Sequence, residues 1–185
     1  MKTSIYSLAR RTLLTCLALV MFPLAVNAAS KEEIDANVEE ALAKFSEESP
    51  AGKRMAERAV GMIVFPKVIK AGIGIGGEYG EGALIVNGQT IDYYSTAAAS
   101  IGFQLGAQVK SQIIMFMTDE ALSTFRNSEG WEAGVDGSVA LIEFGAGGEI
   151  SSNSAQSPII GFIFSNKGLM YNLTFEGSKM TKLNR

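Results

Sequence analysis

Apolar residues recur with a helical period over the part of the chain that follows residue 29. Five of them are spaced three or four positions apart and would share one helix face: Ile34, Val38, Ala41, Leu42 and Phe45. Ser30 can cap this helix, which is predicted over residues 31–48. Ser49 and Pro50 then predict the start of a second helix, which runs to about residue 60.

The period changes to two in a glycine-rich stretch. Gly72, Gly74 and Gly76 alternate with Ile73 and Ile75. Because successive residues of a strand point to opposite faces, this alternation puts bare backbone on one face and isoleucine on the other. Glycine within a strand usually marks a bulge or a close backbone approach. We therefore expect the bare face to lie against another part of the chain or a ligand.

Turn signals divide the following residues into short strands. Asn87-Gly88 predicts a hairpin turn between strands over 83–86 and 90–94. Residues 165–168 predict a second hairpin, whose return strand covers 169–175. The sheet is therefore expected to be built from antiparallel neighbours.

Two further patterns lie between these hairpins and before them. The apolar run over 113–117 indicates a central strand that is covered on both faces. Thr118 can cap a helix predicted over 119–126. Earlier in the chain, an apolar run over 62–65 ends at Pro66, and Val68 and Ile69 form a second run after it.

These elements predict a single α+β domain, in which a twisted, antiparallel, glycine-rich sheet carries two N-terminal helices and one midchain helix. The pattern leaves open whether the sheet closes into a barrel-like form. An outer-membrane β-barrel is a separate alternative for glycine-rich strands in an exported protein. The soluble type of the two N-terminal helices and the apolar run over 113–117 argue against it.

The first residues resemble a secretory signal peptide. Basic residues at positions 2, 10 and 11 precede an apolar stretch too short to span a bilayer, and small residues allow cleavage after Ala28 or Ala29. The apolar stretch continues past Cys16, which disfavours lipidation of this cysteine. The alternative to a cleaved signal peptide is an uncleaved membrane anchor. We predict a signal peptide over 1–29 and a mature domain over 30–185, located in the periplasm.

The side chains available for catalysis are few. The chain has no histidine, and Cys16 is its only cysteine. The commonest general base, metal ligand and thiolate nucleophile are therefore missing from the mature domain. Carboxylates such as Glu78 and Glu81 are scattered near glycine-rich loops and are more typical of solvated positions. We predict a protein that is not an enzyme and has no metal site and no cofactor.

One glycine motif resembles a nucleotide site in form alone. Gly72-x-Gly74-x-x-Gly77 matches the dinucleotide fingerprint, which requires a helix at its end. Here the glycines lead into the strand predicted over 83–86. Glycine-rich β-structure is therefore the better interpretation.

Charge narrows the choice of partners. Without the three basic residues of the signal segment, 13 basic residues remain against 19 acidic ones, a net charge of about −6. This balance argues against nucleic-acid binding. Five basic residues nevertheless cluster within eighteen positions: Lys53, Arg54, Arg58, Lys67 and Lys70. They are either an ordinary solvated surface or a cationic patch for lipid phosphate.

The glycine-rich region also resembles a known family. The residues Val64-Phe65-Pro66-x-Val68-x-Lys70-Ala71-Gly72, followed by Gly76-Gly77-x-x-Gly80-x-Gly82, are similar to the SYLF domain, a lipid-binding module of bacterial secreted proteins and of eukaryotic actin-patch and membrane-ruffle proteins. Ile101-Gly102-Phe103-Gln104-Leu105-Gly106-Ala107-Gln108 fits the same pattern. The likeness covers about residues 35–180.

The resemblance implies non-enzymatic binding of anionic phospholipid membranes at the periplasmic surface. Eukaryotic relatives are associated with phosphoinositides and actin, but only the binding of anionic phospholipid is carried over here. Lys53, Arg54, Arg58, Lys67 and Lys70 are the predicted lipid-binding residues, and only Lys70 belongs to the family-like motif. The alternative is a structural or protein-interaction module of the cell envelope, with an envelope protein as its partner.

Overall fold

A computed structural model describes residues 29–143, 156–168, 174–175 and 177–185. The predicted signal segment over 1–28 and most of the predicted strand over 169–175 lie outside the described residues. The three described helices are α2 (Lys31–Glu48), α3 (Pro50–Ala56) and α4 (Asp119–Asn127). No helix in the described part of the chain is long and apolar enough to cross a bilayer.

The helices begin where the cap signals predict. The Ser30 and Thr118 side chains accept backbone N–H groups of the first turns of α2 and α4, and Ser49 does the same for α3. α3 is shorter than expected and ends at Ala56, because the chain turns there toward the first strand.

Two long strands form most of the sheet. β1 (Gly61–Val86) and β2 (Gln89–Phe116) pair antiparallel along almost their whole length. Asn87 and Gly88 join them with φ angles of 52° and 76°, as the predicted hairpin requires. Pro66 does not end β1, because a register shift between Phe65 and Val68 carries the strand past the proline.

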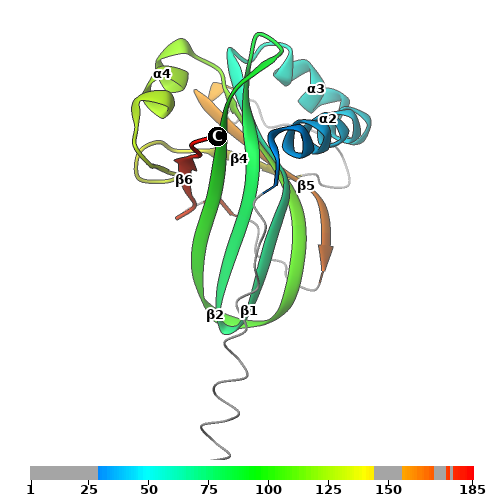
Figure 1. Cartoon of the computed structure of the whole chain (residues 1–185), viewed down its shortest axis with the longest axis vertical. Helices are drawn as coiled ribbons and strands as arrows, with labels where there is room; N and C mark the ends of the chain where they lie inside the picture. Colours follow the sequence, from blue (N-terminus) through cyan, green and yellow to red (C-terminus); the bar gives the residue numbers. More distant parts are fainter. Residues whose placement is uncertain (1–28, 144–155, 169–173, 176) are drawn as a thin grey trace, which may run out of the picture.

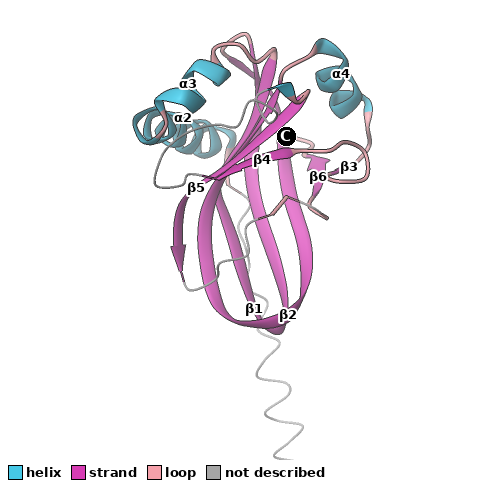
Figure 2. Cartoon of the chain, turned by 180° about the vertical axis from the view of Figure 1, so that it is seen from behind, coloured by secondary structure: helices cyan, strands magenta, loops and turns pink. Residues whose placement is uncertain are grey.

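The β1–β2 pair then folds back on itself. In Figures 1 and 2 both strands run away from the helices, curve over at the far end and return. At the curve, a Cβ on Gly72 would lie 2.3 Å from Gly76 Cα. We call this bend, formed by residues 71–77 of β1 and 99–107 of β2, the folded end. The opposite part of the sheet, near the helices, is the helix end.

Glycines let the two halves of β1 lie face to face. A Cβ on Gly80 would come within 2.8 Å of the Lys67 carbonyl oxygen, and one on Gly82 within 2.0 Å of the Val64 carbonyl oxygen. Of the glycines expected to form a bare face, Gly72 has this close backbone contact, and Gly80 and Gly82 add two more further along the strand. A dinucleotide site requires a helix directly after such glycines. Here β1 continues through them and is followed by β2.

The other strands extend β2. β5 (Ile159–Gly168) pairs with its C-terminal half, β6 (Lys179–Lys182) pairs with residues 94–97, and β3 (Trp131–Glu132) pairs with β6. β4 (Ala140–Glu143) runs parallel to β5, so the sheet is mixed and not purely antiparallel as predicted. The hairpin predicted at 165–168 is also wrong, since β5 continues through these residues and Gly168 pairs with Gln108.

The six-stranded sheet has a core on each face at the helix end. One core packs Ile34, Val38 and Phe45 of α2 against strand residues such as Val64 and Ile113. The other packs Leu122 and Phe125 of α4 against residues such as Ile63 and Ile114. Figure 1 shows the same division, with α2 and α3 on one side of the sheet and α4 on the other. The α+β class and the three predicted helices are confirmed.

Candidate functional site

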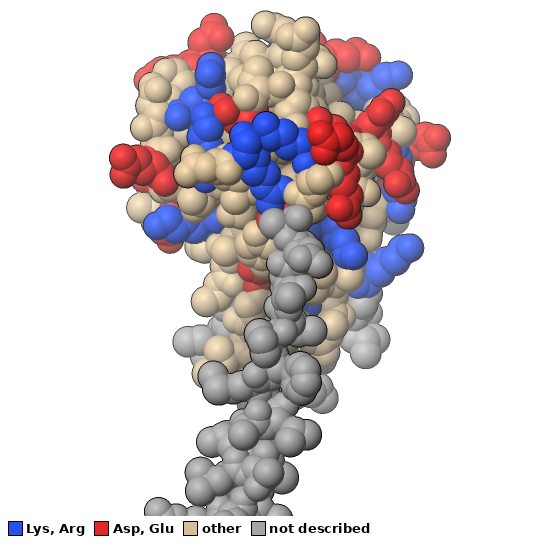
Figure 3. All heavy atoms as spheres, in the orientation of Figure 1, with Lys and Arg blue, Asp and Glu red and all other residues tan. Residues whose placement is uncertain are grey.

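Four of the five predicted lipid-binding residues lie on the surface. Lys53, Arg54 and Arg58 are exposed on α3 and the turn that follows it, and Lys67 is exposed at the register shift of β1. None of the four forms an ion pair with a carboxylate among the described residues. On the face seen in Figure 3, charged side chains gather mainly around the helices.

Lys70 is a correction to the predicted surface. Its side chain is only 5 % exposed, because it lies on the inner face of the folded β1–β2 pair. The C-terminal cations do not join α3 either. Lys182 Nζ pairs with Asp92 Oδ1 at 2.6 Å, and Arg185 pairs with Glu81 Oε1 at 2.7 Å. Figures 1 and 2 place β6 on the side of the sheet that carries α4.

Lys70 belongs to a buried polar cluster inside the fold. Lys110 Nζ donates to Glu78 Oε2 at 2.9 Å, and these side chains are 0 % and 5 % exposed. Burial lowers the pKa of Lys110; the charge and hydrogen bond of Glu78 oppose this effect, and the like charge of Lys70 adds to it. The cluster therefore contains two lysine side chains and one glutamate.

Several polar atoms around this ion pair have no hydrogen-bond partner among the described residues. They are Glu78 Oε1, Thr96 Oγ1 and both side-chain polar atoms of Gln112. Thr96 and Gln112 are fully buried. Most buried polar groups in proteins are paired, so the inner face toward the folded end is unusually polar for a protein interior.

A groove lies beside α2 on the outer face of the same strands. Its volume is about 370 Å³, and α2, β1, β2 and β5 all contribute to its lining. Its basic lining residues come from four different elements, and they are Lys44, Lys67, Lys167 and the buried Lys110. Glu33 and Glu40 of α2 are its acidic members. Lys67 is thus the predicted residue that the fold brings together with lysines distant in sequence.

The outer face beyond this groove exposes apolar side chains. Ile69 is 46 % exposed and its cross-strand partner Val109 is 37 % exposed. At the bend, Ile75 is 72 % exposed. No charged residue occurs in 71–77 or 93–109, so both strands are uncharged throughout the folded end.

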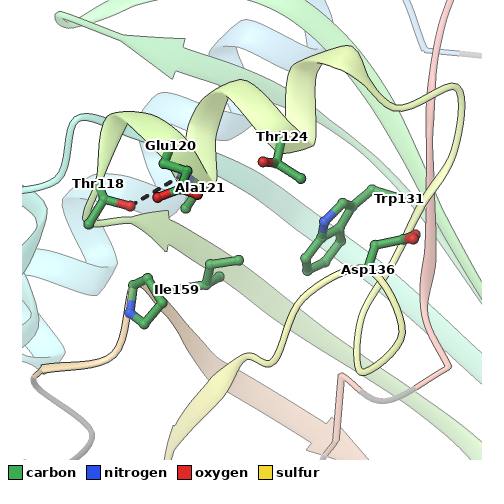
Figure 4. Close-up of a pocket in the computed structure, with 8 residues that line it drawn as sticks. Thr118, Glu120, Ala121, Thr124, Trp131, Asp136 and Ile159 are labelled. Carbon is green, nitrogen blue, oxygen red and sulfur yellow. Dashed lines mark hydrogen bonds between the residues drawn. The ribbon is translucent and has the colours of Figure 1, made fainter.

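A smaller pocket of about 280 Å³ lies between the start of α4, β3 and the start of β5 (Figure 4). Its polar side chains take part in local structure: Thr118 Oγ1 accepts the Ala121 N–H at 3.2 Å, and Asp136 Oδ2 accepts the Glu132 N–H at 2.6 Å. In Figure 4, Thr118 and Glu120 lie at one end and Trp131 and Asp136 at the other. No group of three or more potential metal ligands occurs in the part of the chain that the structure describes.

Sequence reasoning missed both the buried cluster and the groove. Their members are far apart in the chain, as with Lys44, Lys67 and Lys167, and no local spacing connects them. No local signal identified the buried cluster. Because lysine is rarely buried unless it is paired, the sequence favours exposed positions for Lys70 and Lys110.

One of the comparisons with known proteins finds a family model that matches part of the chain. Residues 97–185 match the family model described as Ysc84, Las17-binding protein actin regulator. A search of curated proteins finds no match. The matched residues contain most of β2 and every later element of the domain. The model that these residues match is that of the Ysc84 family, which is the same family as the SYLF domain.

Proposed function

We propose that the protein binds anionic phospholipid membranes at the periplasmic surface and catalyses no reaction. The SYLF family is linked to binding of lipids or actin regulators. The observation that carries the proposal for this chain is local. Lys53, Arg54 and Arg58 are exposed within six residues and have no carboxylate partner among the described residues.

Electrostatics attracts this surface to an anionic membrane. A basic residue near an anionic membrane contributes about 1 kcal/mol, and the attraction fades within a Debye length of roughly 8 Å in physiological salt. Three cations on one short segment therefore contribute about 3 kcal/mol of attraction, provided that the acidic side chains of α2 face away from the membrane.

Liposome co-sedimentation tests the proposal. The wild-type protein should bind phosphatidylglycerol or cardiolipin vesicles, bind neutral vesicles weakly, and lose binding at high salt. The double variant Lys53→Glu/Arg54→Glu should lose most of this binding. Arg126→Glu/Lys179→Glu is a matched control, because it changes the net charge equally at exposed positions of α4 and β6.

The outcomes separate the alternatives. Equal binding to neutral and anionic vesicles would move the contact to an apolar surface. Equal loss in both double variants would mean that only the overall charge matters. Absence of binding to any vesicle would contradict the proposal and favour a protein-interaction module of the envelope.

Contacts of Ala29 support the proposed cleavage of the signal peptide and, with it, the periplasmic location. Ala29 N lies 3.2 Å from Glu81 Oε2, and Arg185 also contacts Glu81 and the Ala29 carbonyl oxygen. Cleavage after Ala28 would turn the Ala29 nitrogen into an ammonium group beside this carboxylate. The intact mass of the protein from the periplasmic fraction should correspond to a chain that starts at Ala29 or Ser30. A full-length or lipid-modified mass would contradict the assignment.

A further inference from the structure

The groove beside α2 combines features that a membrane-facing patch of cations does not need. Lys67 and Lys167 are both exposed, and neither forms an ion pair with a carboxylate among the described residues. Lys44 makes a loose pair with Glu48 at 3.8 Å, and both of these side chains are well exposed. A concave site with cations from three elements can surround an anion instead of only attracting one.

The groove also offers neutral and acidic groups at the same place. Ser165, which has a φ angle of 53°, lines it, and the Ser165 hydroxyl is buried without a hydrogen-bond partner among the described residues. Glu33 and Glu40 add two acceptors on the α2 side. Such a lining suits a ligand with an anionic group and hydrogen-bond donors of its own, as in a glycerophospholipid headgroup.

The size and the surroundings of the groove indicate how such a ligand would lie. About 370 Å³ is at the lower end of the range for small-molecule sites, which suits a headgroup and leaves acyl chains outside. Val109 is part of the lining, and its exposed partner Ile69 lies next to it on the same face. From there the uncharged strands lead to the exposed Ile75 at the folded end.

We propose that this groove binds the phosphate-bearing headgroup of a single phospholipid, with Lys67 and Lys167 on the phosphate and the acyl chains along Ile69 and Val109. The inference rests on the proposed function for the choice of a phospholipid. It differs from that function in the site, which is separate from α3, and in the stoichiometry of one lipid per protein.

The test is a titration with dihexanoylphosphatidylglycerol below its micelle concentration, followed by NMR chemical shifts. Wild-type protein should bind with one site. Lys67→Glu/Lys167→Glu should weaken binding at least tenfold, whereas Lys67→Arg/Lys167→Arg should retain it. The matched control Arg126→Glu/Lys179→Glu should bind within about twofold of wild type. Unchanged affinity in Lys67→Glu/Lys167→Glu would overturn the proposal.

A second arm separates a lipid from a free anion. Ile69→Ser changes a residue outside the groove lining, so it should weaken binding of the short-chain lipid but leave the weaker binding of glycerol 3-phosphate unchanged. Val135→Ser is the control, because Val135 is 74 % exposed in the turn after β3, far from the groove in sequence. If inorganic phosphate binds as tightly as the lipid, the groove is only an anion site and the lipid assignment fails.

The two proposals can fail separately. Vesicle binding without one-site binding of the short-chain lipid would refute the groove and leave the proposed function standing. One-site binding that depends on Lys67 and Lys167, in a protein that ignores vesicles, would refute membrane docking and retain the groove.

Discussion

The helix end and the folded end of the β1–β2 pair are built from the same two strands, but they distribute polar side chains in opposite ways. At the helix end, residues 113–116 are fully buried and apolar on both faces, between α2 on one side and α4 on the other. Toward the folded end, the inner face holds Lys70, Glu78 and Lys110, while the outer face exposes Ile69 and Ile75.

This arrangement toward the folded end costs free energy on both the inner and the outer face of the strands. Burying charges costs free energy even when they are paired, and exposed apolar surface loses the gain that burial would bring. Contiguous exposed apolar surface commonly marks an interaction site. The helix end therefore has the arrangement of an ordinary apolar core, whereas the outer surface toward the folded end suits contact with a partner.

The largest effect is expected from separating the buried ion pair. Lys110→Met leaves the Glu78 carboxylate in the interior without its cation, which should lower the free energy of unfolding by about 3–5 kcal/mol. The double variant Lys110→Met/Glu78→Gln should recover much of this loss, because no buried charge remains unpaired within the pair. Urea denaturation of the three proteins measures both effects. A single variant as stable as wild type would show that water reaches the cluster.

One substitution made at both ends gives the next largest contrast. Ile114→Ala at the helix end creates a cavity at a fully buried position and should cost about 2–5 kcal/mol. Ile75→Ala at the folded end removes a side chain that is 72 % exposed and should change stability by less than about 0.5 kcal/mol. Thermal and urea unfolding would measure the difference. Equal losses would mean that the folded end is covered in solution.

The close contact between the two halves of β1 predicts a smaller but clear effect. Gly82→Ala places a Cβ against the Val64 carbonyl oxygen and should destabilise the fold by about 1–3 kcal/mol or more, because backbone must move. Gly77→Ala is the control, since its Cβ would meet nothing closer than the Ala98 carbonyl oxygen at 3.8 Å. If the two variants have the same urea midpoint, the halves of β1 do not pack as described.

The smallest expected effect is a fall in stability at high pH. Burial raises the pKa of Tyr79, Tyr93 and Tyr94 to about 12, and hydrogen bonds to Glu81 and Asp35 also contribute for Tyr79 and Tyr93. Because these folded-state pKa values exceed the ordinary value of 10.0, the stabilisation is complete below pH 10 and is lost as pH rises toward 12.

Urea titrations between pH 9 and pH 12 would measure this fall, and Tyr93→Phe should reduce it. Lys110 acts in the opposite sense. Because the pKa of Lys110 is lowered in the folded state, its deprotonation at rising pH increases the stability of the fold. The tyrosine variants should therefore all retain Lys110, so that this contribution is the same in each protein. If stability falls equally between pH 9 and pH 12 in wild type and in Tyr93→Phe, the Tyr93 hydroxyl has an ordinary pKa in the folded protein.

The candidate site was predictable only in part. Lys53, Arg54 and Arg58 are neighbours in sequence, so their common surface follows from composition and a short helix. Lys70 was misplaced because its neighbours in sequence do not reveal which face of the strand becomes the interior. The groove could not be predicted, since Lys67 and Lys167 meet only after β5 has paired with β2.

Sequence by itself determined the parts of this protein that depend on a few adjacent residues. Ser30, Ser49 and Thr118 cap their helices because a side-chain oxygen meets a backbone N–H three residues later, and Asn87-Gly88 turns the chain because both residues accept positive φ angles. The family resemblance was likewise visible in the spacing of its glycines.

Only the tertiary structure decided that β1 and β2 continue as single long strands and fold back, so that Glu78 meets Lys110 across 32 residues. It also decided that β4 joins β5 in parallel, and that an apolar face stays open beyond α2. The physical reason is common to all three. A strand's period shows that it has two faces, but the segment that covers each face comes from distant parts of the chain.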